Sequence, residues 1–227
     1  MRIDVLTLFP NAFSYFDESI LARAKKSGAL EINIINIRDF SKDPHKKCDD
    51  YCFGGGSGML MTPQPLYDAI MSVKTENSKV IYLSPKGKVF TQQMSKDLSK
   101  QEHLIFVCGH YEGIDQRIID LCVDMEISIG DYVLTGGELP AMVVVDAISR
   151  HIEGVLGNEQ STVDESFSNN TLEYPQYTRP QEFMGLKVPD VLVSGNHQKI
   201  KEFKEKESQK LTQKLRPDLL KGANDED

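Results

Sequence analysis

The chain is predicted to fold as an α/β protein built around a parallel sheet, and three observations favour this class. Short apolar runs typical of buried strands alternate with segments of helical periodicity. The strands are nearly continuous in apolar residues, as expected when helices cover both faces of a sheet. Three successive strands run directly into loops rich in glycine, proline or serine. Such loops are typical of the ligand-binding edge of an open parallel sheet.

The first half of the chain supplies three strands and three helices. Residues 2–9 alternate and stop at Pro10, and the following helical pattern stops at Gly28. Residues 38–58 are polar, then glycine-rich, and fit neither period, so we expect this long segment to have a binding role. The predicted elements, in order, are a strand at 2–9, a helix at 12–26, a strand at 30–37, a helix at 65–73, a strand at 79–83 and a helix at 92–100.

The second half continues the alternation and then changes character. Residues 157–174 are polar and aperiodic, which is typical of a linker. We therefore expect one domain over 1–157, a linker over 158–174 and a small helical domain over 175–227. The predicted elements are a strand at 103–107, a helix at 115–122, a strand at 125–129, a long apolar helix at 138–153 and a charged helix at 195–215.

Composition excludes several classes of protein. The chain has 227 residues, of which 40% are hydrophobic and 26% charged, and no apolar run approaches the roughly 20 residues that span a bilayer. The first residues lack the pattern of a secretory signal. The spacing of the four cysteines, Cys48, Cys52, Cys108 and Cys122, predicts reduced thiols. We therefore expect a cytoplasmic protein without a membrane segment.

The charge distribution disfavours general nucleic-acid binding but leaves room for a local basic face. A formal net charge of −8 argues against an indiscriminate nucleic-acid binder. Residues 199–221, however, contain eight Lys and Arg against four Asp and Glu. Charge alone favours a solvated helix face there.

Two glycine-rich segments are candidates for ligand-binding loops. Residues 54–58 (GGGSG) match neither a P-loop nor a dinucleotide fingerprint, so alone they indicate a turn or a close backbone approach. Residues 128–140 are more specific, because three glycines stand among the apolar Ile129, Tyr132 and Leu134. This loop suits an adenine ring, and its lack of basic residues disfavours NAD or ATP in it.

Six further motifs can be compared with known families: DDYCFGGGSGMLM (49–61), YLSPKG (82–87), CGHYEGID (108–115), SIGDYVLTGGELPAM (128–142), YTRP (177–180) and VPDVLVSGNH (188–197). Together they resemble the bacterial tRNA (guanine-N1)-methyltransferase family, which modifies the guanosine just 3′ of the anticodon. The resemblance covers almost the whole chain in the same order. It implies a SPOUT-type fold with a deep trefoil knot, a homodimer, S-adenosylmethionine as cofactor and tRNA as partner. Residues 1–157 would then bind the cofactor and 175–227 the tRNA.

The resemblance also implies the residues that hold the cofactor. They come from the three loops that follow predicted strands, so the family and the independent loop argument select the same segments. The expected contacts are Ser84, Pro85, Gly109, Tyr111, Glu112, Ile129, Gly130, Asp131, Tyr132, Val133, Leu134, Gly136, Gly137 and Pro140.

Methylation of guanine N1 requires a general base at N1, a donor at O6 and a methyl group held in line. Arg150 matches the family arginine at O6, although alone it would be a helix-terminal arginine. The family base is an aspartate directly before Ser-Phe, and this chain has Glu165 there, with Asp164 beside it as the substitute. Glu112 is a candidate for assisting guanine binding or recruiting Mg²⁺. The five histidines lack the spacing of a metal-ligand set.

Phosphate contacts and two rival functions complete the expectations. One rival is a SPOUT RNA methyltransferase with another target base. The other is a non-catalytic RNA-binding dimer that lost activity through the Asp-to-Glu change. The phosphate-contact candidates are Arg38, Lys42, Lys46, Lys47, Lys199, Lys201, Lys204, Lys210 and Lys214.

Overall fold

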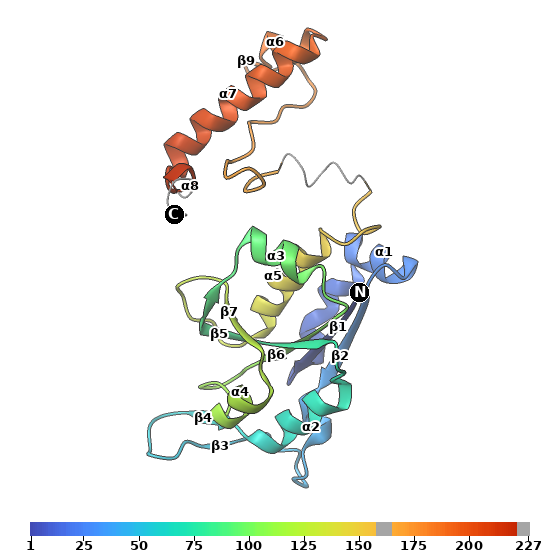
Figure 1. Cartoon of the computed structure of the whole chain (residues 1–227), viewed down its shortest axis with the longest axis vertical. Coiled ribbons are helices and arrows are strands. Elements are labelled where there is room, and N and C mark those ends of the chain that lie inside the picture. Colours follow the sequence, from blue (N-terminus) through green and yellow to red (C-terminus); the bar gives the residue numbers. More distant parts are fainter. Residues whose placement is uncertain (158–164, 222–227) are drawn as a thin grey trace. The chain divides into compact units, whose positions relative to one another are not determined.

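The computed structural model describes residues 1–157 and 165–221 (Figure 1). The chain divides into two compact units, Met1–Gly157 and Asn158–Asp227. Within the described ranges, no helix combines the length and apolarity that crossing a membrane would require.

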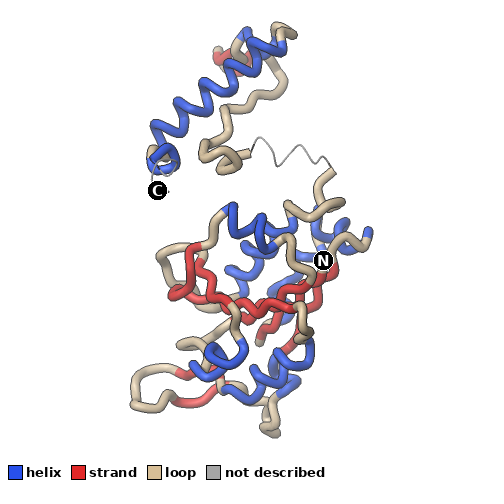
Figure 2. The backbone as a smooth tube through the Cα atoms, in the orientation of Figure 1, coloured by secondary structure: helices blue, strands red, loops and turns tan. Residues whose placement is uncertain are grey.

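The first unit contains a five-stranded sheet in which every neighbouring pair is parallel (Figure 2). The strand order is β2-β1-β6-β5-β7, so the predicted parallel sheet is confirmed. All six residues of β6 are buried, as expected for the middle of the sheet. The strands are β1 (Arg2–Thr7), β2 (Glu31–Asn36), β5 (Ser78–Val89), β6 (His103–Cys108) and β7 (Met125–Ser128).

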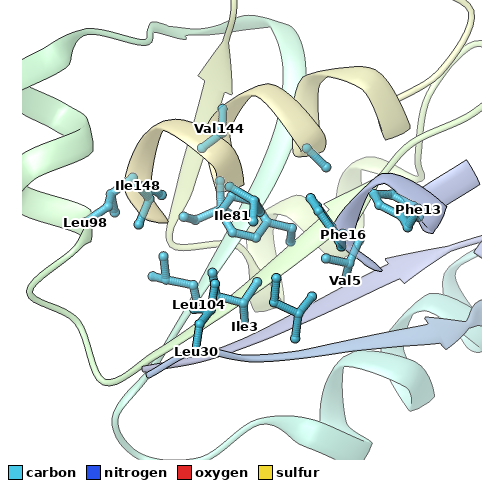
Figure 3. Packing of buried hydrophobic residues seen from close by; sticks show 14 of the residues in the cluster. Ile3, Val5, Phe13, Phe16, Leu30, Ile81, Leu98, Leu104, Val144 and Ile148 are labelled. Atoms are coloured by element: carbon cyan, nitrogen blue, oxygen red, sulfur yellow. The ribbon is translucent and has the colours of Figure 1, made fainter. Parts of the chain in front are cut away.

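Helices cover both faces of this sheet (Figure 1), because the strands carry apolar side chains on both. Along β6, Leu104 and Phe106 join one buried cluster and Ile105 and Val107 the other. Figure 3 shows the first cluster, in which Ile148 of α5 packs near the strands. Its helices are η1 (Pro10–Asp17), α1 (Ser19–Ser27), α3 (Gln92–Leu98) and α5 (Glu138–Ser149), and the opposite face has η2 (Ile37–Phe40), α2 (Pro63–Val73) and α4 (Gln116–Cys122).

The prediction of a single helix over 12–26 is wrong, because the chain forms η1 and α1 with a break between them. Glu18 is extended and Ser19 has φ 50°. In one continuous helix Phe16 and Leu21 would point about 140° apart. The break lets both side chains enter the same buried cluster. α1 then ends as predicted, with Gly28 in the left-handed conformation at φ 78°.

The segment predicted to be irregular over 38–58 contains a missed strand. β3 (Asp49–Tyr51) pairs antiparallel with β4 (Met59–Met61), which lies just beyond it. Positive φ angles at the connecting glycines let the chain reverse there. Three-residue strands give too little alternation to be recognised in a sequence.

The loop predicted at 84–87 is instead an irregular part of the long strand β5. Leu83 and Lys88 both pair with Ile127 of β7, so the intervening residues form a bulge. A Cβ on Gly87 would lie 2.4 Å from the Ile127 backbone nitrogen. Glycine at this position therefore permits the bulge to lie directly against β7.

A row of polar side chains crosses four adjacent strands near their amino ends. Asn33 donates to Asp4 Oδ1 at 2.8 Å, and Asp4 Oδ2 lies 2.8 Å from His103 Nε2. His103 Nδ1 lies 3.0 Å from the Ser78 hydroxyl. Because Asp4 is fully buried, its carboxylate depends on these partners and on Arg2 at 2.8 Å.

We expect Asp4→Ala to lower the free energy of unfolding by about 3–5 kcal/mol, because it leaves the buried His103 and the partly buried Asn33 without their acceptor. Urea titration measures this. Asp97→Ala is the matched control, since the Asp97–Lys100 ion pair is exposed and worth at most about 1 kcal/mol. Equal losses of unfolding free energy in the two variants would show that the buried row of polar side chains stabilises the protein no more than an exposed ion pair does.

The second unit contains a long helix and short elements around it. α7 (His197–Leu215) agrees with the predicted charged helix, and Asn196 caps it by accepting the Lys199 N–H at 3.1 Å. The two-residue strands were not predicted, since they are too short to show a pattern. The other elements are β8 (Glu182–Phe183), β9 (Leu186–Lys187), α6 (Asp190–Val193) and α8 (Asp218–Lys221).

Candidate functional site

A cavity of about 290 Å³ lies beyond residues 83, 108 and 128 of β5, β6 and β7. Most of its walls come from the three segments that follow these paired residues, at 84–86, at 109–113 and, apart from residue 131, at 129–137. The volume is close to the lower limit of roughly 300 Å³ for small-molecule sites. The position is the carboxyl edge of a parallel sheet, where such sites are expected.

Every predicted cofactor contact except Asp131 lines this cavity. Asp131 is exposed and lies outside the lining. Because side chains at neighbouring loop positions point in different directions, loop membership alone does not select wall residues. The residues brought together are Ser84, Pro85, Gly109, Tyr111, Glu112, Ile129, Gly130, Tyr132, Val133, Leu134, Gly136, Gly137 and Pro140.

Several polar wall residues were not predicted as cofactor contacts. Lys86 brings a cation to the cavity, so the absence of basic residues in the loop at 128–140 does not describe the whole site. Tyr82 and Glu126 belong to strands, and the available signal was that each stands between two apolar residues. The other polar side chains missed include His110, Gln116 and Thr135.

Close backbone contacts hold the glycine loop against the end of β6. Gly137 N–H donates to the Gly109 carbonyl at 2.8 Å. A Cβ on Gly137 would lie 2.8 Å from Cys108 Cα, and one on Gly136 would lie 2.8 Å from His110 Nδ1. These glycines therefore serve contacts within the protein wall.

A buried carboxylate fixes the start of α5 behind this wall. Glu138 Oε1 accepts a 2.8 Å hydrogen bond from the Thr7 hydroxyl, which itself accepts the Phe9 N–H at 2.9 Å. Burial, and then the nearby Glu138 carboxylate, raise the pKa of the Cys108 thiol. The ends of β1 and β6 and the first turn of α5 thus meet around one carboxylate.

Two of the residues that line the cavity carry a buried polar atom without a hydrogen-bond partner. Glu126 Oε2 and His110 Nδ1 are buried and have no hydrogen-bond partner within the described residues. The His110 ring also packs against Phe9, with centroids 4.8 Å apart, and edge-on against Tyr111. A ligand with polar groups would give the two atoms their missing partners.

Tyr82 lies beneath the loop at 109–113, and burial, followed by the Glu126 charge, raises its pKa from 10.0 to about 12. Because the raised pKa favours the neutral phenol, its stabilising contribution is complete below pH 10 and is lost as the pH approaches about 12. We expect absorbance titration to show one phenol ionising near that value. The step should be missing in Tyr82→Phe, and a transition that persists in this variant would assign it to another tyrosine.

The hairpin β3–β4 is attached to the cavity wall through its second strand. Glu112 N–H donates to the Met59 carbonyl at 2.9 Å, and Met61 N–H donates to the Gly113 carbonyl at 3.0 Å. A Cβ on Gly58 would collide with the Glu112 side chain. The strongly exposed aromatic rings of Tyr51 and Phe53 therefore belong to a hairpin in contact with the cavity loop.

The lysines predicted to contact phosphate beside this hairpin have partners of their own. Lys42 lies 3.3 Å from Asp68, Lys46 lies 2.8 Å from Asp39, and Lys47 lies 3.8 Å from Asp50. Each pair is exposed and contributes at most about 1 kcal/mol. A phosphate could therefore replace these carboxylates at little cost in stability.

Within the first unit, the predicted catalytic Arg150 does not line the cavity. Arg150 caps the far end of α5, about 15 Å along the helix axis from Pro140 at the cavity. It lines a separate hollow with Tyr15 and Asp146. Glu165 belongs to the second unit, where its carbonyl accepts the Ser168 N–H at 3.2 Å. Asp164 lies outside the described residues.

The chain is similar to known proteins along nearly its whole length. A curated protein of Clostridioides difficile (strain 630) is 59% identical over 230 residues, which cover 99% of this chain and 100% of that protein. A protein of Caldanaerobacter subterraneus subsp. tengcongensis is 58% identical, covering 99% of this chain and 93% of its own length. Both are named tRNA (guanine-N(1)-)-methyltransferase. The family described as tRNA (Guanine-1)-methyltransferase TrmD matches residues 1–222, and the chain belongs to this family.

Proposed function

We propose that the protein transfers a methyl group from S-adenosylmethionine to N1 of the guanosine just 3′ of the anticodon in tRNA. The observation that carries this proposal is the cavity formed by three glycine-containing segments in a chain that matches the family along its length. The relatives are named for the same reaction on tRNA.

The cavity has the composition that S-adenosylmethionine requires. Ile129, Tyr132 and Leu134 supply apolar surface for an adenine ring, and the close-packed glycine loop supplies backbone groups. The unpartnered Glu126 Oε2 and His110 Nδ1 fit a ligand that carries amino and hydroxyl groups. When bound, this cofactor supplies an electrophilic methyl group on its sulfonium sulfur.

The carboxylate of Glu165 removes the proton from guanine N1, which makes the nitrogen nucleophilic. Negative charge then spreads to O6, where the Arg150 guanidinium stabilises it through charge-assisted hydrogen bonds. Moving the target guanine out of the RNA stack costs a few kcal/mol of free energy. The lysines of the β3–β4 region and of α7 offset part of it by binding phosphates.

A homodimer reconciles these roles with the position of Arg150. Its side chain cannot cross the length of α5 to reach the cavity in its own chain, so the arginine acts in the partner's cavity. The exposed Leu139 and Val143 of α5 offer apolar surface for such an interface. The strand order, with β6 between β1 and β5, is compatible with the trefoil knot that the family implies.

Mixing subunits tests this arrangement. If Arg150 and Glu165 of one site come from different subunits, we expect Arg150→Ala and Glu165→Ala chains, each inactive alone, to recover about a quarter of wild-type activity after random reassociation, because half the dimers then contain one intact site. Methyl transfer is measured after the subunits are exchanged and heterodimers are verified. If verified heterodimers stay inactive, Arg150 and Glu165 do not act from different subunits.

Two accessory features belong to the same proposal. Mg²⁺, as a hydrated ion, would be recruited near Glu112, although the described residues contain no group of three or more metal-ligating side chains. The place of action would be the cytoplasm, where tRNA is modified.

Transfer of labelled methyl groups to a tRNA transcript with G beside the anticodon tests the function directly. We expect N1-methylguanosine in the digested product and no label in a transcript with A at that position. Label on another base would favour a SPOUT methyltransferase of different specificity. Binding of S-adenosylmethionine and tRNA without transfer would favour a non-catalytic RNA-binding dimer.

A further inference from the structure

One stripe of α7 contacts the segment that carries Glu165. Three of its side chains, and that of the residue that caps its C-terminal end, are spaced four residues apart and follow one another along one side of the helix. Each of them contacts a residue between 165 and 174. The four are Lys204, Ser208, Thr212 and Arg216.

The central contact captures both backbone groups of Leu172. Its N–H donates to Thr212 Oγ1 at 2.8 Å, and its carbonyl accepts from Ser208 Oγ at 2.6 Å. The Thr212 hydroxyl donates in turn to the Ser208 carbonyl at 2.7 Å. Since Thr212 is fully buried, losing its hydroxyl would leave the Leu172 N–H without its partner.

Aromatic rings secure the segment on both sides of Leu172. The Lys204 ammonium lies 4.5 Å from the centre of the Tyr174 ring, and the Arg216 guanidinium lies 5.8 Å from that of Phe167. Both distances are within reach of a cation–π attraction. The segment thus runs along the stripe in the direction opposite to the helix.

Internal hydrogen bonds connect this anchored segment to Glu165. Phe167 N–H donates to the Thr171 carbonyl at 2.8 Å, which closes a turn directly before Leu172. Glu173 N–H donates to Ser166 Oγ at 3.0 Å. Since the Glu165 carbonyl also accepts a bond within this turn, the backbone of Glu165 is tied to residues that α7 holds.

We propose that Ser208 and Thr212 are positioning residues for methyl transfer, because they fix the turn that bears Glu165 to α7. This inference rests on the proposed function, in which Glu165 is the general base. Of the predicted phosphate contacts on α7, Lys204 belongs to the stripe and packs on Tyr174, whereas Lys199, Lys201, Lys210 and Lys214 lie outside the stripe. When tRNA docks on this helix, the Glu165 carboxylate would then be presented together with the helix, as one preorganised unit.

Thr212→Val tests the proposal, since valine keeps the shape of threonine but loses the hydroxyl. We expect the single-turnover rate of methyl transfer to fall by about 10- to 100-fold, as for a misplaced catalytic group. The dissociation constants for S-adenosylmethionine and tRNA should change less than about twofold. Hydrogen exchange of the Leu172 amide should accelerate, and Thr212→Ser should restore both properties.

Two further variants keep the test decisive. Ser208→Ala removes only the bond to the Leu172 carbonyl and is the milder probe if Thr212→Val unfolds the second unit. Gln213→Ala changes an exposed neighbour on α7 and should leave rate and exchange unaltered.

Faster exchange at Leu172 with an unchanged rate in Thr212→Val would overturn the positioning role. A rate loss explained entirely by weaker tRNA binding would overturn it as well. Failure of the proposed function is distinguishable, because the unaltered protein would then transfer no methyl group, while the Leu172 exchange still responds to Thr212→Val. Failure of the base assignment alone would leave Glu165→Gln with full turnover.

Discussion

Glu165→Gln is expected to slow methyl transfer by about 10²–10⁴-fold while leaving the affinities for S-adenosylmethionine and tRNA nearly unchanged. Glutamine keeps the size of glutamate but cannot accept the proton of guanine N1. The loss should therefore fall on the chemical step. Single-turnover rates, with dissociation constants measured alongside, separate this effect from weaker binding.

Asp164→Asn is the internal control for this experiment. It removes the neighbouring carboxylate and should leave the rate near wild type. Should Asp164→Asn stop turnover while Glu165→Gln remains active, the base is Asp164. If neither change matters, a carboxylate base in this segment is wrong and Glu112 or solvent becomes the next candidate.

Gly137→Val is expected to abolish S-adenosylmethionine binding. Its Cβ would lie 2.8 Å from Cys108 Cα and 2.9 Å from the Gly109 nitrogen, both backbone atoms that have little room to move. The loop at 135–137 must then leave the end of β6, which opens the wall of the cavity. We also expect overpacking to cost about 1–3 kcal/mol of stability.

Gly157→Val is the matched control, because a Cβ at Gly157 meets nothing within 4 Å and the backbone has no positive φ. Calorimetry should find wild-type affinity for S-adenosylmethionine in the control and none in folded Gly137→Val. Normal affinity in folded Gly137→Val would show that the cofactor does not depend on this wall.

Much of the sheet could be predicted from the sequence because its strands are buried on both faces. Continuous apolar runs such as 103–107 identify a central parallel strand without knowledge of its partners. The loops of the site could be predicted from the sequence for a related reason. Glycines cluster where backbone approaches backbone, and here they mark the carboxyl edge of the sheet.

What could not be predicted depends on contacts distant in sequence. The break between η1 and α1 places Phe16 and Leu21 in one cluster, and helical periodicity contains no information on it. The bulge in β5 requires Gly87 to meet β7, forty residues further along the chain. The wall position of Lys86 follows from that bulge.

The ion pairs of Lys42, Lys46 and Lys47 have a consequence for the thermodynamics of RNA binding. A lysine that is free in solution releases a condensed counterion from the RNA when it takes a phosphate, and this release gives binding its steep salt dependence. A lysine that first leaves a carboxylate exposes an anion, which attracts a cation from solution. The net number of ions released per contact is then below one. The salt dependence of tRNA affinity would therefore undercount the lysines that touch phosphate.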